Sequence, residues 1–383
     1  MKNLIMLIMA SVMVFSSCGK VNDKMIEPTE EETVVVDVVG ERADSITKSL
    51  TLQEKVCQMM FVTGESIAGK SIVTNFDEAV YEALVNYPVG GVILFSGNIQ
   101  SREQVINLID SYQINSKIPL FVGVDEEGGK VARIGSKEWM GTDKIPAMKT
   151  VKSASEAYEI GKTLGRDLSG LHFNLDFAPV ADVLLSDKNT EIGSRSFGTD
   201  PIWVGDMVSE VVKGLEESSV SSVLKHFPGH GSTTVDSHTG YSASYRTVDE
   251  LRETEFIPFK KGIEAGCDFV MVSHMTLENA IEEKVPASLS KEVVEGLLKG
   301  ELGFEGIVIT DSLSMGAITK EYTTGNSAVM AINAGVDMLL MPKNVSEAVN
   351  AITDAVTNGE ISEERIDESV RKIIRIKIEK GLM

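Results

Sequence analysis

The stretch from Lys225 to His238 concentrates side chains that could do chemistry. It reads Lys-His-Phe-Pro-Gly-His-Gly-Ser-Thr-Thr-Val-Asp-Ser-His and holds three of the five histidines of the chain. Histidine is the side chain whose ordinary pKa lies nearest to neutral pH, so a histidine cluster in a loop indicates proton transfer or metal binding. Both interpretations are open at this point.

The spacing of the first two histidines argues against a metal. His226 and His230 are four residues apart, which on a helix would place two metal ligands on one face. Pro228 and Gly229 lie between them and exclude a helix. The sequence also has no His-Glu-x-x-His motif and no Cys pair beside them. Lys225 and His226 fit better as a pair of donors for substrate hydroxyls, and we expect no metal.

Asp236 and His238 lie two residues apart at the end of the same stretch. In an extended segment such residues point the same way, so the carboxylate can hydrogen-bond one ring nitrogen while the other faces a substrate. This contact would favour the imidazolium and suit a general acid. From the spacing alone, a solvated turn is the simpler interpretation.

Asp311 and Arg195 each have a functional and a structural interpretation, whereas His172 has only a structural one. Asp311 follows an apolar run, where a carboxylate could act as nucleophile or stabilise a developing cation, or could cap the next helix. Arg195 could bind substrate hydroxyls or form a surface salt bridge. His172 comes early in its strand and fits a structural role.

Eight short apolar runs alternate with amphipathic stretches from about residue 45 onward. Strands that are apolar on both faces and separated by helices indicate a parallel sheet. Eight strands in about 340 residues, with no Gly-x-Gly-x-x-Gly motif after the first, favour a single (β/α)₈ TIM-like barrel of the α/β class over a doubly wound sheet. The expected strands are 59–62, 91–95, 120–124, 173–177, 222–226, 269–273, 306–310 and 336–341. The clearest helices are 102–112, 154–168, 248–265 and 345–356, and the expected N-caps are Ser153, Thr247 and Ser290.

The barrel predicts where the candidate residues meet, because active sites of such barrels lie at the C-terminal ends of the strands. Polar side chains stand at the ends of the third, fifth, sixth and seventh strands: Asp125, Lys225, His226, His274 and Asp311. We therefore expect these side chains to gather at one mouth of the barrel.

The composition and the first residues indicate the compartment and partners. Asp and Glu outnumber Lys and Arg by 57 to 36, and the net charge of −21 argues against binding to nucleic acid or anionic lipid. Residues 1–17 resemble a lipoprotein signal peptide, with an apolar stretch too short to span a membrane, and Cys18 would then carry the lipid. The alternative is an ordinary secretory signal.

The signal predicts an exported protein, anchored by lipid to the bacterial cell membrane and facing outside the cytoplasm. Residues 18–44 would form an acidic linker, and the lipid anchor would be the only membrane contact. The remaining cysteines, Cys57 and Cys267, lie in apolar surroundings, which predicts two unpaired buried thiols.

Taken together, the segments resemble glycoside hydrolase family 3, in its β-N-acetylhexosaminidase branch. The matching segments keep the order of the family and cover nearly all of residues 45–383, which would form one catalytic domain. The 225–238 run is specific to the branch and the others to the family. They are 50–56, 124–133, 177–183, 192–198, 225–238 and 309–315.

The resemblance implies a role for each matching residue. Asp311 would be the nucleophile, His238 the general acid/base and Asp236 its partner. The residues that would hold the terminal N-acetylglucosamine are Asp125, Arg195, Lys225 and His226, with His274 and Asp182 as weaker matches. Many relatives have a second Asp or an Ala where this chain has Ser312.

The resemblance also implies a retaining hydrolase that releases terminal β-linked N-acetylglucosamine from peptidoglycan fragments or other glycans. It would act as a monomer on a carbohydrate substrate and need no metal or organic cofactor. One alternative is a phosphorylase, because an imidazole base would not repel phosphate as a carboxylate does. Others are a β-glucosidase of the same family and a non-catalytic lipoprotein that binds glycans.

Overall fold

The computed structural model describes residues 37–233 and 242–383. The contacts divide the chain into two units, residues 1–37 and 38–383, and the second unit carries the fold described below. Its first helix, α1 (Val38–Ser49), includes residues that the sequence analysis assigned to the linker. The predicted signal peptide, Cys18, Asp236 and His238 lie outside the described residues.

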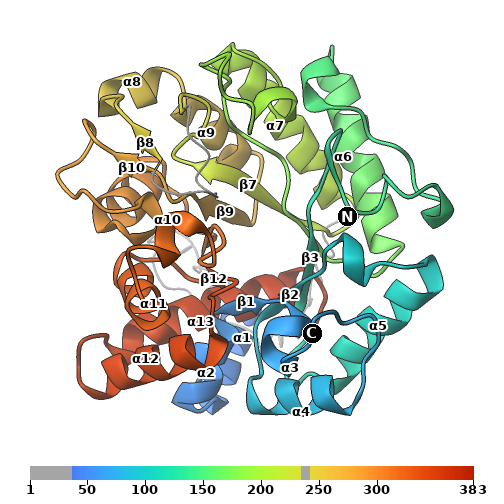
Figure 1. The fold of residues 1–383 in the computed structure, drawn as a ribbon, viewed down its shortest axis with the longest axis vertical. Helices are drawn as coiled ribbons and strands as arrows, with labels where there is room; N and C mark the ends of the chain where they lie inside the picture. Colours follow the sequence, from blue (N-terminus) through green and yellow to red (C-terminus); the bar gives the residue numbers. More distant parts are fainter. Residues whose placement is uncertain (1–36, 234–241) are drawn as a thin grey trace, which may run out of the picture. The chain divides into compact units, whose positions relative to one another are not determined.

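Eight parallel strands form a barrel-like sheet in the order β11-β9-β7-β6-β3-β2-β1-β12 (Figure 1). Ile309 on β11 forms a parallel bridge with Met338, just before β12, so the two ends of this order meet. The predicted α/β barrel and its eight strands are confirmed. The strands are β1 (Met60–Val62), β2 (Gly91–Ile93), β3 (Phe121–Val124), β6 (Leu175–Asp176), β7 (Ser221–Phe227), β9 (Phe269–Val272), β11 (Ile307–Thr310) and β12 (Leu339–Leu340).

Every residue of these eight strands is buried. Side chains on one face of the sheet fill the barrel interior, and helices cover the other face. This is why the strands read as continuous apolar runs. Inside the barrel, the rings of Phe61 and Phe177 pack edge to face with centroids 5.3 Å apart. Gly123 lies beside them, and a Cβ at this position would come within 2.8 Å of Phe177. The glycine therefore makes room for the two rings.

The helices surround the sheet (Figure 1). After α1 they are α2 (Leu52–Gln58), α3 (Gly64–Ala68), α4 (Glu78–Asn86), α5 (Arg102–Asn115), α6 (Ala154–Ser169), α7 (Pro201–Glu216), α8 (Val248–Glu253), α9 (Phe256–Glu264), α10 (Gly316–Thr319), α11 (Thr324–Asn333), α12 (Val345–Thr357) and α13 (Glu363–Glu379). A π-helix spans Glu292–Glu301. Two small strand pairs join loops, β4 (Glu126–Gly128) with β5 (Val131–Ala132) and β8 (Ala243–Ser244) with β10 (Thr276–Leu277).

The predicted helix over 248–265 is two helices, α8 and α9. Pro258 has no amide hydrogen to donate to the carbonyl of Thr254, so the helical hydrogen bonding is interrupted there. The expected caps are present at Ser153 and Thr247, whose side chains accept hydrogen bonds from the Glu156 and Glu250 amides. The Ser290 hydroxyl accepts from the Val293 amide, although the helix begins one residue later than expected.

Cys57 and Cys267 are buried free thiols, as predicted. Burial raises the pKa of Cys57 to about 12 and that of Cys267 well above its ordinary value, so neither is poised as a thiolate. None of the described helices combines the length and apolar character needed to cross a membrane.

Candidate active site

A cavity of about 460 Å³ opens at the C-terminal ends of the strands. Five of the residues expected at this mouth of the barrel or in substrate binding line it: Asp125, Arg195, Lys225, His226 and Asp311. They come from the end of β3, the loop before α7, the end of β7 and the end of β11. Residues far apart in the sequence are thus brought into one cavity.

A carboxylate that the sequence analysis did not single out, Glu127, organises the cations of the cavity. Lys225 Nζ lies 2.6 Å from Glu127 Oε1 and 2.9 Å from Asp125 Oδ1. Arg195 donates two hydrogen bonds to the Glu127 carboxylate, each 2.8 Å long. Asp125 and Glu127 are two residues apart in an extended segment and so share a face, which was the available signal.

Within this network Glu127 and Lys225 stabilise each other's charged form. Burial alone would raise the pKa of the Glu127 carboxyl, but Lys225 and Arg195 outweigh burial and lower it to about 2. Burial would lower the pKa of Lys225, but Asp125 and Glu127 outweigh it and raise that pKa. Both groups are therefore ionised at any physiological pH, and the network holds its donors in fixed positions.

Arg133 also lines the cavity, with Nη2 3.6 Å from Asp125 Oδ2. Its loop is fixed by the buried carboxylate of Glu126, which points away from the cavity. Glu126 accepts hydrogen bonds from the amides of Arg133, Ile134 and Gly135 at 2.7, 2.8 and 2.9 Å. Asp125 and Glu127 therefore face the cavity, whereas Glu126 between them binds the neighbouring loop.

His226 is oriented by Asp182, a residue that the sequence analysis rated as a weak match for substrate binding. His226 Nδ1 lies 2.7 Å from Asp182 Oδ2, and Nε2 lies 3.4 Å from Arg195 Nη2. Burial would raise the pKa of Asp182, but the neighbouring His226 outweighs it and lowers the pKa. Asp182 is fully buried and does not line the cavity, so its link to the cavity runs through His226.

His230 has its own partner, because its Nδ1 lies 2.8 Å from the Thr233 hydroxyl. Burial lowers the pKa of this imidazole, although Asp182 opposes the effect. His230 is therefore a buried, neutral ring beside the cavity, with its centroid 6.1 Å from that of His226.

Asp311 lies directly after β11, and its amide donates to the Val272 carbonyl at 2.8 Å. Its Oδ1 accepts a hydrogen bond of 2.7 Å from the Ser312 amide. The next helix, α10, begins five residues later with Met315 as N-cap, so Asp311 does not cap it. Of the two interpretations open for Asp311, the geometry leaves a carboxylate facing the cavity.

His274, one of the weaker matches, is not among the residues that line the cavity. Its ring is buried, with Nδ1 2.7 Å from the Ser288 hydroxyl and Nε2 2.9 Å from the Ser312 carbonyl. It thus contacts the segment that follows Asp311.

The cavity is lined by both charged and apolar side chains. The charged ones belong to the network around Glu127, and the apolar ones include Ile93, Phe177, Met271 and Leu340. A pyranose presents hydroxyls at its edge and C–H groups on its faces, so it offers partners to both kinds of side chain. The arrangement suits a sugar held with its reacting carbon near a carboxylate.

Comparisons with known proteins identify the family of this chain. The sequence model of the glycosyl hydrolase family 3 N-terminal domain matches residues 51–376. Beta-hexosaminidase A of Pseudoalteromonas piscicida is 31% identical over 336 residues, 80% of this chain and 56% of the relative. The beta-hexosaminidase of Tolumonas auensis is 35% identical over 283 residues, 72% of this chain and 82% of the relative.

Among solved structures, a family 3 beta-N-acetylglucosaminidase from Paenibacillus sp. superimposes with a TM-score of 0.82 and 34% identity. The match covers 87% of this chain and 63% of that one. The chain therefore spans less than two thirds of this structure and of the Pseudoalteromonas relative. A beta-N-acetylhexosaminidase from Beutenbergia cavernae gives a TM-score of 0.73 and 28% identity, covering 87% of this chain and 99% of that one.

Proposed function

Because the chain belongs to glycosyl hydrolase family 3, we propose that it is a retaining glycosidase acting on terminal β-linked N-acetylglucosamine. Its substrates would be peptidoglycan fragments or other glycans. The observation that carries the proposal is the cavity in which the ion network of Asp125, Lys225, Glu127 and Arg195 accompanies the carboxylate of Asp311. The similarity to beta-hexosaminidases supports the acetamido sugar.

Binding would use groups that are already in position. Asp125 and Lys225 would exchange hydrogen bonds with sugar hydroxyls, and Arg195 and His226 would act as further donors. Since Glu127 and Asp182 hold these groups before a ligand arrives, little side-chain freedom is lost on binding.

The chemistry would be a double displacement. The Asp311 carboxylate attacks the anomeric carbon, and His238 protonates the leaving oxygen as the glycosidic bond breaks, which gives a glycosyl-enzyme. The neutral His238 then takes a proton from water, whose oxygen attacks the anomeric carbon and frees Asp311. Retaining enzymes generally use a second carboxylate as acid/base. Here Asp236 and His238, assigned from the sequence, would replace it with an imidazole whose ordinary pKa already suits neutral pH.

A chromogenic nitrophenyl N-acetyl-β-glucosaminide tests the proposal directly. The wild type should cleave it, and Asp311→Asn should lower kcat by about 10⁴-fold or more because the nucleophile is lost. Cleavage of the glucoside with none of the acetamido sugar would refute the substrate assignment. Tight binding without turnover would favour a glycan-binding protein, and sugar 1-phosphate formed on adding phosphate would identify a phosphorylase.

We further propose that the protein is exported and lipid-anchored at Cys18, on the basis of the signal-like sequence of residues 1–17. Cells expressing the wild type should hold it in the membrane fraction, and Cys18→Ser should release it. Equal partition of the two proteins would contradict the anchor.

A further inference from the structure

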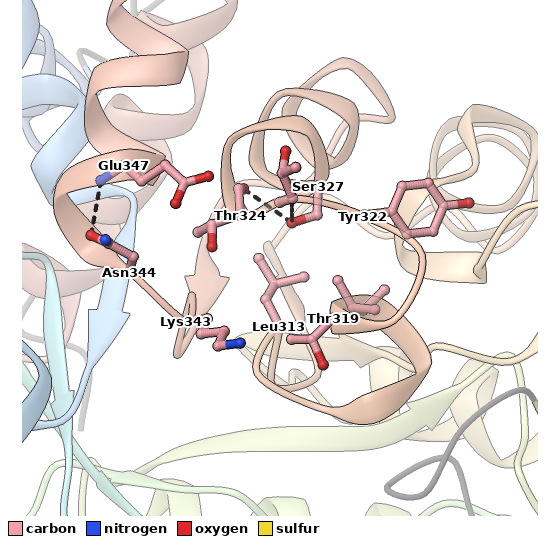
Figure 2. Close-up of a pocket in the computed structure, with 10 residues that line it drawn as sticks. Leu313, Thr319, Tyr322, Thr324, Ser327, Lys343, Asn344 and Glu347 are labelled. Carbon is pink, nitrogen blue, oxygen red and sulfur yellow. Dashed lines mark hydrogen bonds between the residues drawn. The ribbon is translucent and has the colours of Figure 1, made fainter.

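A second cavity lies beside the catalytic one, at the same end of the barrel. Its volume is about 480 Å³, close to the 460 Å³ of the catalytic cavity. It is formed by the segments that follow β11 and β12 together with the first residues of α11 and α12 (Figure 2). We call it the β11–β12 cavity.

Two short segments contribute residues to both cavities. In the first, Leu313 lines the β11–β12 cavity, whereas Ser312 and Ser314 line the catalytic one. In the second, Met341 lines the catalytic cavity and Lys343 lines the β11–β12 cavity. Met341 has a φ of 48°, the left-handed conformation that non-glycine residues rarely adopt. Neighbouring residues of these two segments thus line the two cavities.

The chemistry of the β11–β12 cavity parallels that of the catalytic one. Figure 2 shows Lys343 and Glu347 extending toward Leu313 and Thr324 from the β12–α12 side. Lys343 is exposed and forms no hydrogen bond or ion pair within residues 37–233 and 242–383. Leu313 and Ile318 supply an apolar surface, and Thr319 and Thr324 add hydroxyls. A lysine, a carboxylate, hydroxyls and an apolar patch are the groups that suit a sugar.

Glu347 explains why this cavity does not simply favour an anion. Its Oε1 accepts a hydrogen bond of 3.0 Å from the Gly325 amide in the first turn of α11. The carboxylate therefore already occupies the positive end of that helix and would repel a phosphate. A neutral polyol can accept from Lys343 and donate to Glu347 at the same time.

We propose that the β11–β12 cavity binds a further sugar unit of the glycan whose terminal unit occupies the catalytic cavity. The inference rests on the proposed function. An enzyme that removes the terminal sugar leaves every other unit of that chain on the leaving-group side, so the cavity would contribute to binding of the leaving group. It would make the enzyme prefer oligosaccharides over small glycosides.

Lys343→Ala tests the inference with two substrates. On the nitrophenyl glycoside, which has no second sugar, kcat/KM should stay within about twofold of the wild type, because the variant touches only the second cavity. On a β-linked N-acetylglucosamine trisaccharide, kcat/KM should fall about tenfold through KM, since a hydrogen bond to a charged group is lost. Lys343→Arg should restore part of the loss, and Glu347→Gln should lower the same ratio while keeping its contact with Gly325.

Lys260→Ala is the matched control, because Lys260 is an exposed lysine on α9 that lines neither cavity. Equal losses on both substrates, or no loss on the trisaccharide, would overturn the inference. If the wild type cleaves neither substrate, the proposed function fails, and calorimetric titration of the trisaccharide decides the inference separately. Weaker binding to Lys343→Ala than to the wild type would then support the site, and equal binding would refute it.

Discussion

The two ends of the barrel both bury charged side chains, but they treat the charge in opposite ways. At the C-terminal end, Glu127 is paired with Lys225 and Arg195, and its pKa falls to about 2. At the N-terminal end, Lys377 is fully buried with its Nζ 2.9 Å from Gln58 Oε1 and 5.2 Å from the centre of the Phe121 ring. Burial lowers the pKa of Lys377 to about 7.

Glu216, also at the N-terminal end, is a second group whose pKa lies near neutrality. Lys380 lies 2.5 Å from Glu216 and 2.7 Å from Asp268, so one cation serves two carboxylates. Burial, and then the Asp268 charge, raise the pKa of Glu216 to about 7. Groups that titrate near neutrality often indicate a functional site, yet here they lie at the end of the barrel away from the catalytic cavity. Around the catalytic cavity, by contrast, the pairing of Glu127 with Lys225 and Arg195 keeps its pKa low.

Glu127→Gln would break the pairing at the C-terminal end and should have the largest effect. The variant leaves Lys225 and Arg195 buried without their shared carboxylate, which costs about 3–5 kcal/mol of unfolding free energy. We expect kcat/KM on the nitrophenyl glycoside to fall at least about 100-fold, because misplaced cations hold the sugar poorly. Urea unfolding and steady-state kinetics measure the two effects.

Glu191→Gln is the matched control for Glu127→Gln. Glu191 also pairs with Arg195, at 3.3 Å, but its side chain is 36% exposed. We expect a loss of less than about 1 kcal/mol, since exposed pairs contribute little. Similar losses for the two variants would show that the buried position of Glu127 is not what matters.

Lys377→Met tests whether the buried Lys377 lowers the free energy of unfolding. The folded-state pKa of about 7 lies below the ordinary lysine value, so the unfolded chain binds more protons between these two values. The stability contribution of Lys377 is therefore present above about pH 10 and is lost as pH falls through 7. Replacing it with Met should raise the unfolding free energy by about 1–4 kcal/mol at pH 6, and by less at pH 10.

Activity should be unchanged in Lys377→Met, because α13 contributes nothing to the catalytic cavity. Lys260→Met, on the exposed face of α9, should leave both stability and its pH dependence as they are. A loss of stability in Lys377→Met at every pH would mean that the contact with Gln58 outweighs the cost of burial.

The sequence was sufficient for the barrel, because every strand is buried on both faces and reads as an apolar run. It was less informative about direction at the strand ends. His274 was expected in the mouth because the sixth strand was predicted to end at Ser273, but β9 ends at Val272. His274 therefore lies outside the strand, where the alternation of side chains no longer fixes their direction.

Glu127 could have been found from its spacing, because it lies two residues after Asp125 in an extended segment. Arg133 offered no such signal. It follows the β4–β5 hairpin, in a loop whose amides at Arg133, Ile134 and Gly135 donate hydrogen bonds to Glu126. This loop has no regular pattern, so the position of Arg133 could not be predicted.

Glu216→Gln should have the smallest effect on the unfolding free energy. It contrasts with Lys377→Met because the two groups affect stability in different pH ranges. The folded-state pKa of Glu216, about 7, lies above the ordinary value, so its contribution is fully present below about pH 4 and is lost as pH rises through 7. The glutamine cannot ionise, so at pH 8 the variant should be more stable than the wild type by about 1–2 kcal/mol, allowing for partial solvent screening. At pH 5 the two should be nearly equal. Urea unfolding at both pH values measures this, and a variant that is destabilised most at pH 8 would show that Lys380 needs the ionised Glu216 as its partner.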